Sequence, residues 1–538
     1  MRRFVLTCIA TAAMAAGAAA SAHADAAGDV KAARDAYDRQ DPQTAMDAVS
    51  RAINAGTLRG ADLSAAHSLR CRVLVATGNA EPAVTEAARA LELDQKNAEA
   101  HACNGAVAAA AGNFTEGLAA YDRAVSLDPK NGAIAADRAA ILMLAGRSPE
   151  AVAAMDGVIA NNPRAAAERR AEWLTSRGRM HASMRNPDLA LKDIEAAIAV
   201  TPADSPDLAD RHFLRARLHI DRRRFDDALD AINAAIRLSE SAAPLRRGVL
   251  YATRANIYAT IGQYQPAVAD FDGAIGLVPD GPPSLLASWY ANRGKVKAEA
   301  GDSAGAVADF GRALAQQPED ADLLSDRGNI HLRAGDVARA APDLEAAARL
   351  APRDPVNHSR LAWLRVEQGD YDRAIAAGDE VVKLMPNDPF ALWERGIFRF
   401  LGGRYTDAAA DFGKVTAAAP SNPYAAMFAH VARVRSGEHG TELLAKQSEK
   451  MDRTAWPGPA VELLLGRIQP ADVTSAAGAD PAEADKRLAE ANFYVGMWYL
   501  AQNERRSAAE MLRRSADSGI RTVVETAAAR SELGRIGG

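Results

Sequence analysis

Histidine offers the clearest opportunity for chemistry in this chain, because four histidines recur at one position of a repeating pattern. They are His67, His101, His212 and His358, and neutral imidazole is the commonest metal ligand among side chains. His212 and His219 can share one helix face, yet no third ligand accompanies them at a spacing typical of a metal site. We therefore interpret the histidines as packing residues and predict no metal site.

The sequence also lacks the main signatures of catalysis and cofactor binding. It contains no HExxH zinc-protease pattern, no GxGxxG dinucleotide-binding pattern and no GxxxxGK[ST] phosphate-binding loop. The acidic pair Asp226-Asp227 falls on a predicted helix surface, where solvated charge is the ordinary interpretation. We predict a protein that is not an enzyme, has no catalytic residues and needs no cofactor.

The first 24 residues have the pattern of a signal peptide. Arg2 and Arg3 precede an apolar stretch, and Ala22-His23-Ala24 fits the small-x-small cleavage pattern. We predict cleavage near Ala24 and a bacterial periplasmic location, with an uncleaved anchor as the alternative. No later segment approaches the ~18 apolar residues that span a bilayer, so no integral membrane segment is expected after cleavage.

Two cysteines follow the predicted cleavage site, at nearly matching places in adjacent repeats. Cys71 and Cys103 would meet an oxidising compartment after export, where a disulfide between them is one interpretation that the sequence leaves open. The alternative is that both are small buried residues in helix packing. No CxxC pair occurs, so a zinc or redox site is not expected.

Small residues recur at a fixed step along most of the chain. A period in this range indicates stacked supersecondary units, each burying its apolar face only against its neighbours. Such a chain builds an extended surface rather than a pocket, so we predict binding rather than catalysis. Residues 34 apart include Ala83, Gly117 and Ala151, and then Ala306, Ala340, Ala374 and Ala408.

One unit, from Ala98 to Asn131, resembles the tetratricopeptide repeat (TPR). The shared features are Gly105, Gly112, Tyr121, Ala124 and Pro129 at the family's positions. The resemblance implies an all-α fold, a right-handed superhelical solenoid of helix–turn–helix units. The expected organisation is a signal peptide at 1–24, a degenerate unit at 26–59, about ten units at 64–422, an irregular helical region at 423–488, and a last unit with a capping helix at 489–538.

Arginine at the seventh position of a unit recurs with an acid at the twenty-third. We predict partly buried ion pairs between the two helices of a unit or between adjacent units. The six predicted pairs are Arg70 with Glu86, Arg177 with Asp193, Arg254 with Asp270, Arg293 with Asp309, Arg327 with Asp343, and Arg395 with Asp411.

The TPR resemblance implies that the first helix of each unit lines a concave groove. The early units offer mostly alanine there, such as Ala102, Ala106, Ala109 and Ala110. The middle units offer Asn256, Asn292 and Asn329, whose amides can donate to and accept from a peptide backbone. Some TPR proteins clamp a terminal carboxylate with two such asparagines and cations, but here Ala252, Asp322 and Asp326 occupy the cationic positions.

The late units carry most of the large aromatic groove residues. On a concave face they would be anchors for a partner, and the alternative is that the C-terminal region covers them. The two alternatives remain open at this point. The candidate anchors are Trp363, Phe390, Trp393, Ile397, Phe400, Leu401 and Tyr424.

The C-terminal region resembles the periplasmic NlpI-type TPR lipoproteins over about 80 residues. The shared features are Trp456-Pro457, Leu465-Gly466, the stretch from Glu490 to Gly496, Tyr499-Leu500 and Glu525. The resemblance implies an adaptor that scaffolds peptidoglycan endopeptidases and a processing protease.

We therefore predict an exported TPR scaffold that binds extended or helical segments of envelope proteins in its groove. A periplasmic component of a secretion, pilus or polysaccharide export assembly is the alternative. The net charge of -5 disfavours nucleic acid as a partner. The sequence leaves the oligomeric state open.

Overall fold

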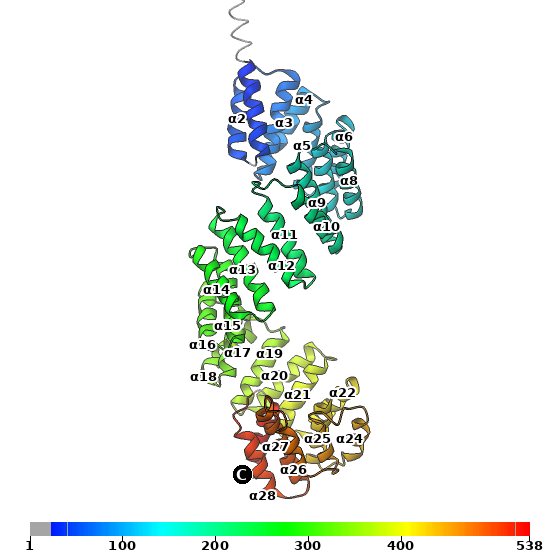
Figure 1. The fold of residues 1–538 in the computed structure, drawn as a ribbon, viewed down its shortest axis with the longest axis vertical. Coiled ribbons are helices and arrows are strands. Elements are labelled where there is room, and N and C mark those ends of the chain that lie inside the picture. The colour runs from blue at the N-terminus through cyan, green and yellow to red at the C-terminus, as the bar shows by residue number, and fades with distance from the viewer. Residues whose placement is uncertain (1–22, 40, 522, 538) are drawn as a thin grey trace, which may run out of the picture. The chain divides into compact units, whose positions relative to one another are not determined.

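The computed structural model describes residues 23–39, 41–521 and 523–537, in which every regular element is a helix (Figure 1). Most of the predicted signal peptide lies outside these residues. The chain divides into two compact units, Met1–Ile257 and Tyr258–Gly538. Each unit is described by itself below.

The first unit begins with a helix over residues 23–38, and its helices then pack in chain order. They are α2 (Pro42–Asn54), α3 (Gly60–Ala76), α4 (Ala80–Leu93), α5 (Ala98–Ala110), α6 (Phe114–Leu127), α7 (Gly132–Leu144), α8 (Ser148–Asn161), α9 (Ala167–Ser183), α10 (Pro187–Val200), α11 (Leu208–Asp221), α12 (Phe225–Leu238) and α13 (Pro244–Thr260), the last as far as Ile257.

The second unit continues with the same hairpins and ends in shorter, less regular helices. They are α14 (Tyr264–Leu277), α15 (Pro283–Glu299), α16 (Ser303–Gln316), α17 (Ala321–Arg333), α18 (Val337–Leu350), α19 (Pro355–Glu367), α20 (Tyr371–Leu384), α21 (Pro389–Leu401), α22 (Tyr405–Ala418), α23 (Pro423–Arg435), α24 (Thr441–Ser448), α25 (Gly458–Leu464), α26 (Pro470–Ala477), α27 (Ala484–Ala501), α28 (Arg505–Ala516) and α29 (Val524–Ile536).

The turn inside each hairpin is set by one residue in the left-handed conformation. Glycine usually occupies it, as at Gly112 (φ 82°) and Gly403 (φ 74°), because this conformation strains a side chain with a Cβ. Arg185, Arg223 and Asn503 hold the equivalent place in three hairpins. Asn503 lies between α27 and α28, so these two helices repeat the TPR turn at the end of the chain.

Close approach of the two helices explains the small eighth residue of each unit. A Cβ added to Gly396 would lie 2.7 Å from the ring of Phe412, which is the bulky twenty-fourth residue of that unit. Gly496 and Leu512 meet in the same way in the last hairpin, at 2.8 Å. The small residue of the first helix and the bulky residue of the second thus meet in these two hairpins.

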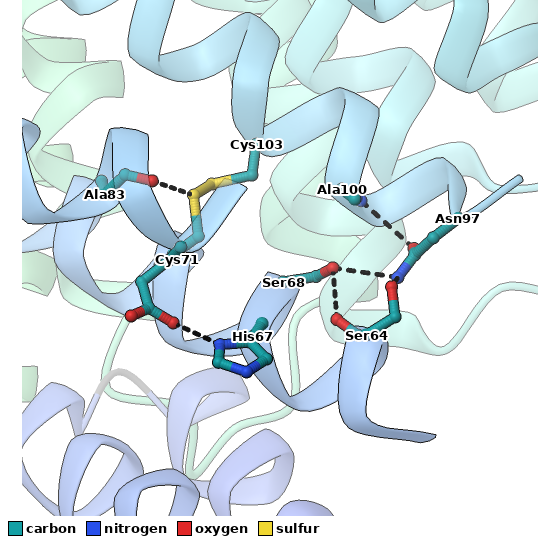
Figure 2. Close-up of a disulfide and its surroundings, with 9 residues drawn as sticks. Ser64, His67, Ser68, Cys71, Ala83, Asn97, Ala100 and Cys103 are labelled. Atoms are coloured by element: carbon teal, nitrogen blue, oxygen red, sulfur yellow. Dashed lines mark hydrogen bonds and ion pairs between the residues drawn. A yellow bond between two sulfur atoms is a disulfide. The ribbon is translucent and has the colours of Figure 1, made fainter. Parts of the chain in front are cut away.

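The last residue of a unit often caps the next first helix. The side chains of Asn97, Asp354 and Asp388 each accept a hydrogen bond from a backbone N–H in the first turn. Asn97 also donates to the hydroxyls of Ser64 (2.8 Å) and Ser68 (3.0 Å) in the preceding unit. Figure 2 shows this junction beside the bond between Cys71 and Cys103.

The disulfide alternative is the one that the structure adopts. Cys71 on α3 and Cys103 on α5 are bonded, which joins the first helices of two successive repeats. Both cysteines are also buried. The covalent link fixes the relative position of α3 and α5 within the first unit.

Five of the six predicted ion pairs are confirmed, and several of them extend to a neighbouring repeat. Their shortest N···O distances are 2.6–2.7 Å, as in Arg293 with Asp309 and Arg395 with Asp411. Arg293 also contacts Asp272 of the preceding repeat at 2.5 Å, and Arg395 contacts Asp379 at 3.0 Å. One arginine thus joins three helices. Arg254 and Asp270 of the sixth pair belong to different units.

Candidate functional site

The C-terminal helices cover most of the late aromatic residues that we considered as anchors. Ile397, Phe400 and Leu401 are at most 1% exposed, so they cannot contact a partner in an open groove. The ring of Phe400 lies 6.3 Å from that of Phe493 on α27. Ser531 on α29 donates a hydrogen bond of 2.7 Å to the carbonyl of Leu401. The anchor hypothesis is therefore wrong for these three residues, because helices distant in sequence fill the space in front of them.

Three of the other four late aromatic residues are partly covered, and two of these three are hydrogen-bonded. Trp363 donates to Glu394 (2.7 Å) and Tyr424 donates to Glu490 (2.9 Å). Trp393 packs against the same hydrophobic core. Phe390 is 65% exposed, so it is the member of this set that a partner can reach without rearrangement.

Buried glutamates, which the sequence analysis did not identify as a group, attach the C-terminal helices. Glu525 on α29 accepts a hydrogen bond from Tyr494 (2.7 Å), and burial together with the charge of Glu490 raises its pKa to about 7. Glu490 also accepts from Trp456 (2.8 Å). Glu490 and Glu525 are among the residues shared with NlpI-type proteins, and this resemblance could have identified them from the sequence.

A second anchor of this kind is Glu532, whose side chain is fully buried. It pairs with Arg435 of α23 at 2.9 Å and with Arg535 at 2.9 Å, and it accepts a hydrogen bond from Tyr405. A fully buried carboxylate with these partners holds α29 in one position on the preceding helices. The C-terminal region is therefore an integral part of the second unit's core.

The three predicted amides are divided between the units. Asn256 lies in the first unit, whereas Asn292 and Asn329 lie on α15 and α17 of the second. Asn329 lines a pocket of about 160 Å³ together with Arg333, Arg360 and Trp363. Of the three predicted asparagines, Asn329 is therefore the one that lines a pocket described here.

Most charges around the second unit's groove already have partners. Asp326 pairs with both Lys295 (3.1 Å) and Arg360 (3.0 Å) across three first helices. Arg521, which also lines the pocket, pairs with Glu367 at 3.2 Å. These pairs reduce the attraction that the groove can offer to a charged partner.

The first unit has a groove pocket of a different kind, with a volume of about 250 Å³. Ile194, Leu214 and Leu218 give it an apolar lining. Three charged residues, Arg179, Arg217 and Asp221, also line it. Both arginines are exposed, and neither makes an ion pair within residues 23–39 and 41–257. They occupy the same position in successive repeats, which was visible in the sequence but was not part of the predicted site.

One short motif of the chain is known from catalytic sites, and the structure shows where it lies. Residues 301–305 match the GxSxG pattern of serine hydrolases, but Gly301 and Asp302 lie in the turn between two helices and Ser303 begins α16, so no strand-to-helix elbow is formed. Asp302 in this turn accepts the N–H of Gly305 as a helix cap. Across the described ranges, no group of three or more His, Cys, Asp and Glu residues could hold a metal ion.

None of the described helices has the length and apolarity that crossing a membrane would need.

A sequence profile described as the tetratricopeptide repeat matches more than half of the chain. The matched stretches are residues 69–132, 104–166, 175–243, 213–282, 292–355 and 359–423. No curated protein matches the chain.

Several solved structures of repeat proteins resemble the chain. A tetratricopeptide repeat protein from Parabacteroides merdae is 19% identical with a TM-score of 0.37, over 48% of this chain and 98% of that one. YrrB, described as a TPR protein with an unusual peptide-binding site, is 22% identical with a TM-score of 0.30, over 37% and 97%. Yeast Tom70 is 15% identical with a TM-score of 0.31, over 88% and 95%.

Proposed function

The chain belongs to the tetratricopeptide repeat family, and from this premise we propose that it is an exported, non-catalytic scaffold that binds segments of other envelope proteins. The observation that carries the proposal is the pocket of Arg179 and Arg217 in the first unit. It combines an apolar floor with two exposed arginines that make no ion pair in the described part of the first unit, and the exposed Asp221 also lines it. An extended or helical segment with a carboxylate beside an apolar side chain would satisfy both features.

Export is supported by two independent features. Residues 1–24 have the composition of a signal peptide. The disulfide between Cys71 and Cys103 is of a type that persists in oxidising compartments such as the bacterial periplasm. Both features favour a partner that is itself an envelope protein.

The class of partner is proposed from the C-terminal resemblance. NlpI-type proteins scaffold peptidoglycan hydrolases and a processing protease, and we propose that this chain does the same. Components of a secretion, pilus or polysaccharide export machine are the competing partners, and the identity of the captured proteins separates the two.

The test is capture from an envelope extract with the mature protein. The variant Arg179→Glu/Arg217→Glu reverses the charge of the pocket. The matched control, Arg123→Glu/Arg237→Glu, changes two exposed arginines on the second helices α6 and α12. We expect the wild type and the control to capture a cell-wall hydrolase or protease, and the pocket variant to lose it. Equal capture by all three proteins would exclude this pocket as the binding site.

A further inference from the structure

The first unit contains a second cavity, lined by residues that the groove pocket above does not use. Its volume is about 220 Å³, and it lies among α3, α5 and α7, the first helices of three successive repeats. Ala102, Ala106 and Ala140 contribute only methyl groups to its lining, and these small side chains leave the cavity unfilled. Our prediction of a smooth alanine wall is therefore incomplete here, because charged residues of neighbouring helices share the same space.

Arg72 of α3 lines the cavity and is held by an aromatic ring. Its guanidinium lies 5.0 Å from the ring centre of Tyr37, a distance typical of a cation–π interaction. Within residues 23–39 and 41–257 its guanidinium makes no hydrogen bond or ion pair. Its donors are therefore available to a group inside the cavity.

Asp137 of α7 lines the same cavity and carries the opposite charge. Burial raises the pKa of its carboxyl, which Arg72 and Arg169 lower in part. In the described part of the first unit, no side chain donates a hydrogen bond to this carboxylate. The Asp137 carboxylate is half-buried and faces the cavity with no donor in the described part of the first unit, so a bound ammonium group would be favoured beside it.

The walls of the cavity are held in place by bonds on two sides. Cys103, which lines the cavity, is covalently bonded to Cys71, the residue before Arg72. Arg34, from the helix that supplies Tyr37, forms two hydrogen bonds to Glu99 of α5, at 2.8 and 3.1 Å. The helices that carry Arg72 and Asp137 are therefore held in fixed positions around the cavity, as a binding site requires.

We propose that this cavity binds a small zwitterion of amino-acid size. The carboxylate of the ligand would accept from Arg72, its ammonium group would donate to Asp137, and its side chain would contact the alanines. The volume favours this size, because pockets for drug-sized ligands are typically about 300–1,000 Å³. This inference is independent of the proposed scaffold function, since it involves other residues and a small molecule.

The test measures the melting temperature of the mature protein with each L- and D-α-amino acid, followed by calorimetric titration of those that stabilise it. We expect at least one amino acid to raise the melting temperature by several degrees at saturating concentration. Its N-acetyl derivative and its amide each lack one charge, and we expect both to bind at least about tenfold more weakly.

Three variants complete the test. Arg72→Met and Asp137→Asn should each weaken binding by about tenfold or more, whereas Glu116→Gln on the exposed surface of α6 should leave it unchanged. The proposal is overturned if no amino acid alters the melting temperature or gives heat of binding with folded wild-type protein. It is also overturned if the N-acetyl derivative binds as tightly as the free amino acid, or if both cavity variants retain full affinity.

Discussion

The two units differ in how their charged groove residues are partnered. In the first unit, Arg179 and Arg217 are exposed beside a mainly apolar pocket and make no ion pair within residues 23–39 and 41–257. In the second, Asp326 pairs with Lys295 and Arg360, and α27 and α29 fill the end of the groove. Residue types at groove positions therefore do not decide whether their side chains are open to a partner. The decision depends on what the rest of the chain places in front of them.

The largest expected effect tests whether the late aromatic residues are core. Phe400→Ala removes a fully buried ring and should lower the free energy of unfolding of the second unit by about 3–5 kcal/mol. The matched change Phe390→Ala, at an exposed ring, should cost less than about 0.5 kcal/mol. Both losses can be measured by unfolding each variant in urea and monitoring each unit by hydrogen exchange. Similar small losses would mean that the C-terminal helices do not cover Phe400 in solution.

The next effect tests the ion pairs that join the repeats of the second unit. Asp309 is fully buried beneath Arg293, Lys297 and Arg312, so Asp309→Ala leaves the buried Arg293 with only its exposed partner Asp272 and removes the carboxylate that pairs with Lys297. We expect a loss of about 3 kcal/mol or more. Asp272→Ala removes the exposed partner of the same arginine and should cost less than about 1 kcal/mol. An unchanged melting temperature for Asp309→Ala would contradict the structural role of the pairs.

These pairs show how far the sequence determines the fold. The pair of Arg293 with Asp309 could be predicted from the repeat, because both residues and the turn glycine Gly301 between them belong to one hairpin. The contact of Arg293 with Asp272 was missed because it joins two repeats. The sequence left the burial of Phe400 open, because Phe493, which covers it, is distant in sequence. The repeat period does not indicate which surface the helix of Phe493 packs against. The cavity of Arg72 and Asp137 depends on how three repeats curve together, which no single repeat specifies.

A smaller effect concerns pH and distinguishes the C-terminal core from the first unit. The pKa of Glu525 is about 7 in the folded protein, above its unfolded value of about 4.3. Its contribution to stability is therefore complete below about pH 4.3 and is lost as the pH rises to 7. Between pH 5 and 8 we expect the second unit to lose about 2–3 kcal/mol, measured by urea unfolding. Glu525→Gln should remove this dependence, and an equal slope in the variant would assign it to other groups.

The smallest effect concerns a turn of the first unit. Arg223 has φ 56° where most repeats have glycine, so Arg223→Gly relieves local strain. We expect the first unit to gain up to about 1 kcal/mol, measured by thermal unfolding. Gly112→Arg places a side chain at the equivalent turn and should cost a similar amount. A loss of stability in Arg223→Gly would mean that the arginine side chain contributes more than the turn costs.

The most direct test of the central claim compares the two grooves in one capture experiment from envelope extract. One variant is Arg179→Glu/Arg217→Glu in the first unit, and the other is Trp363→Ala/Phe390→Ala in the second, both checked for folding. The account predicts that the first variant loses the envelope partner and the second retains it. Retention by the first variant and loss by the second would contradict the account and place the binding surface in the second unit.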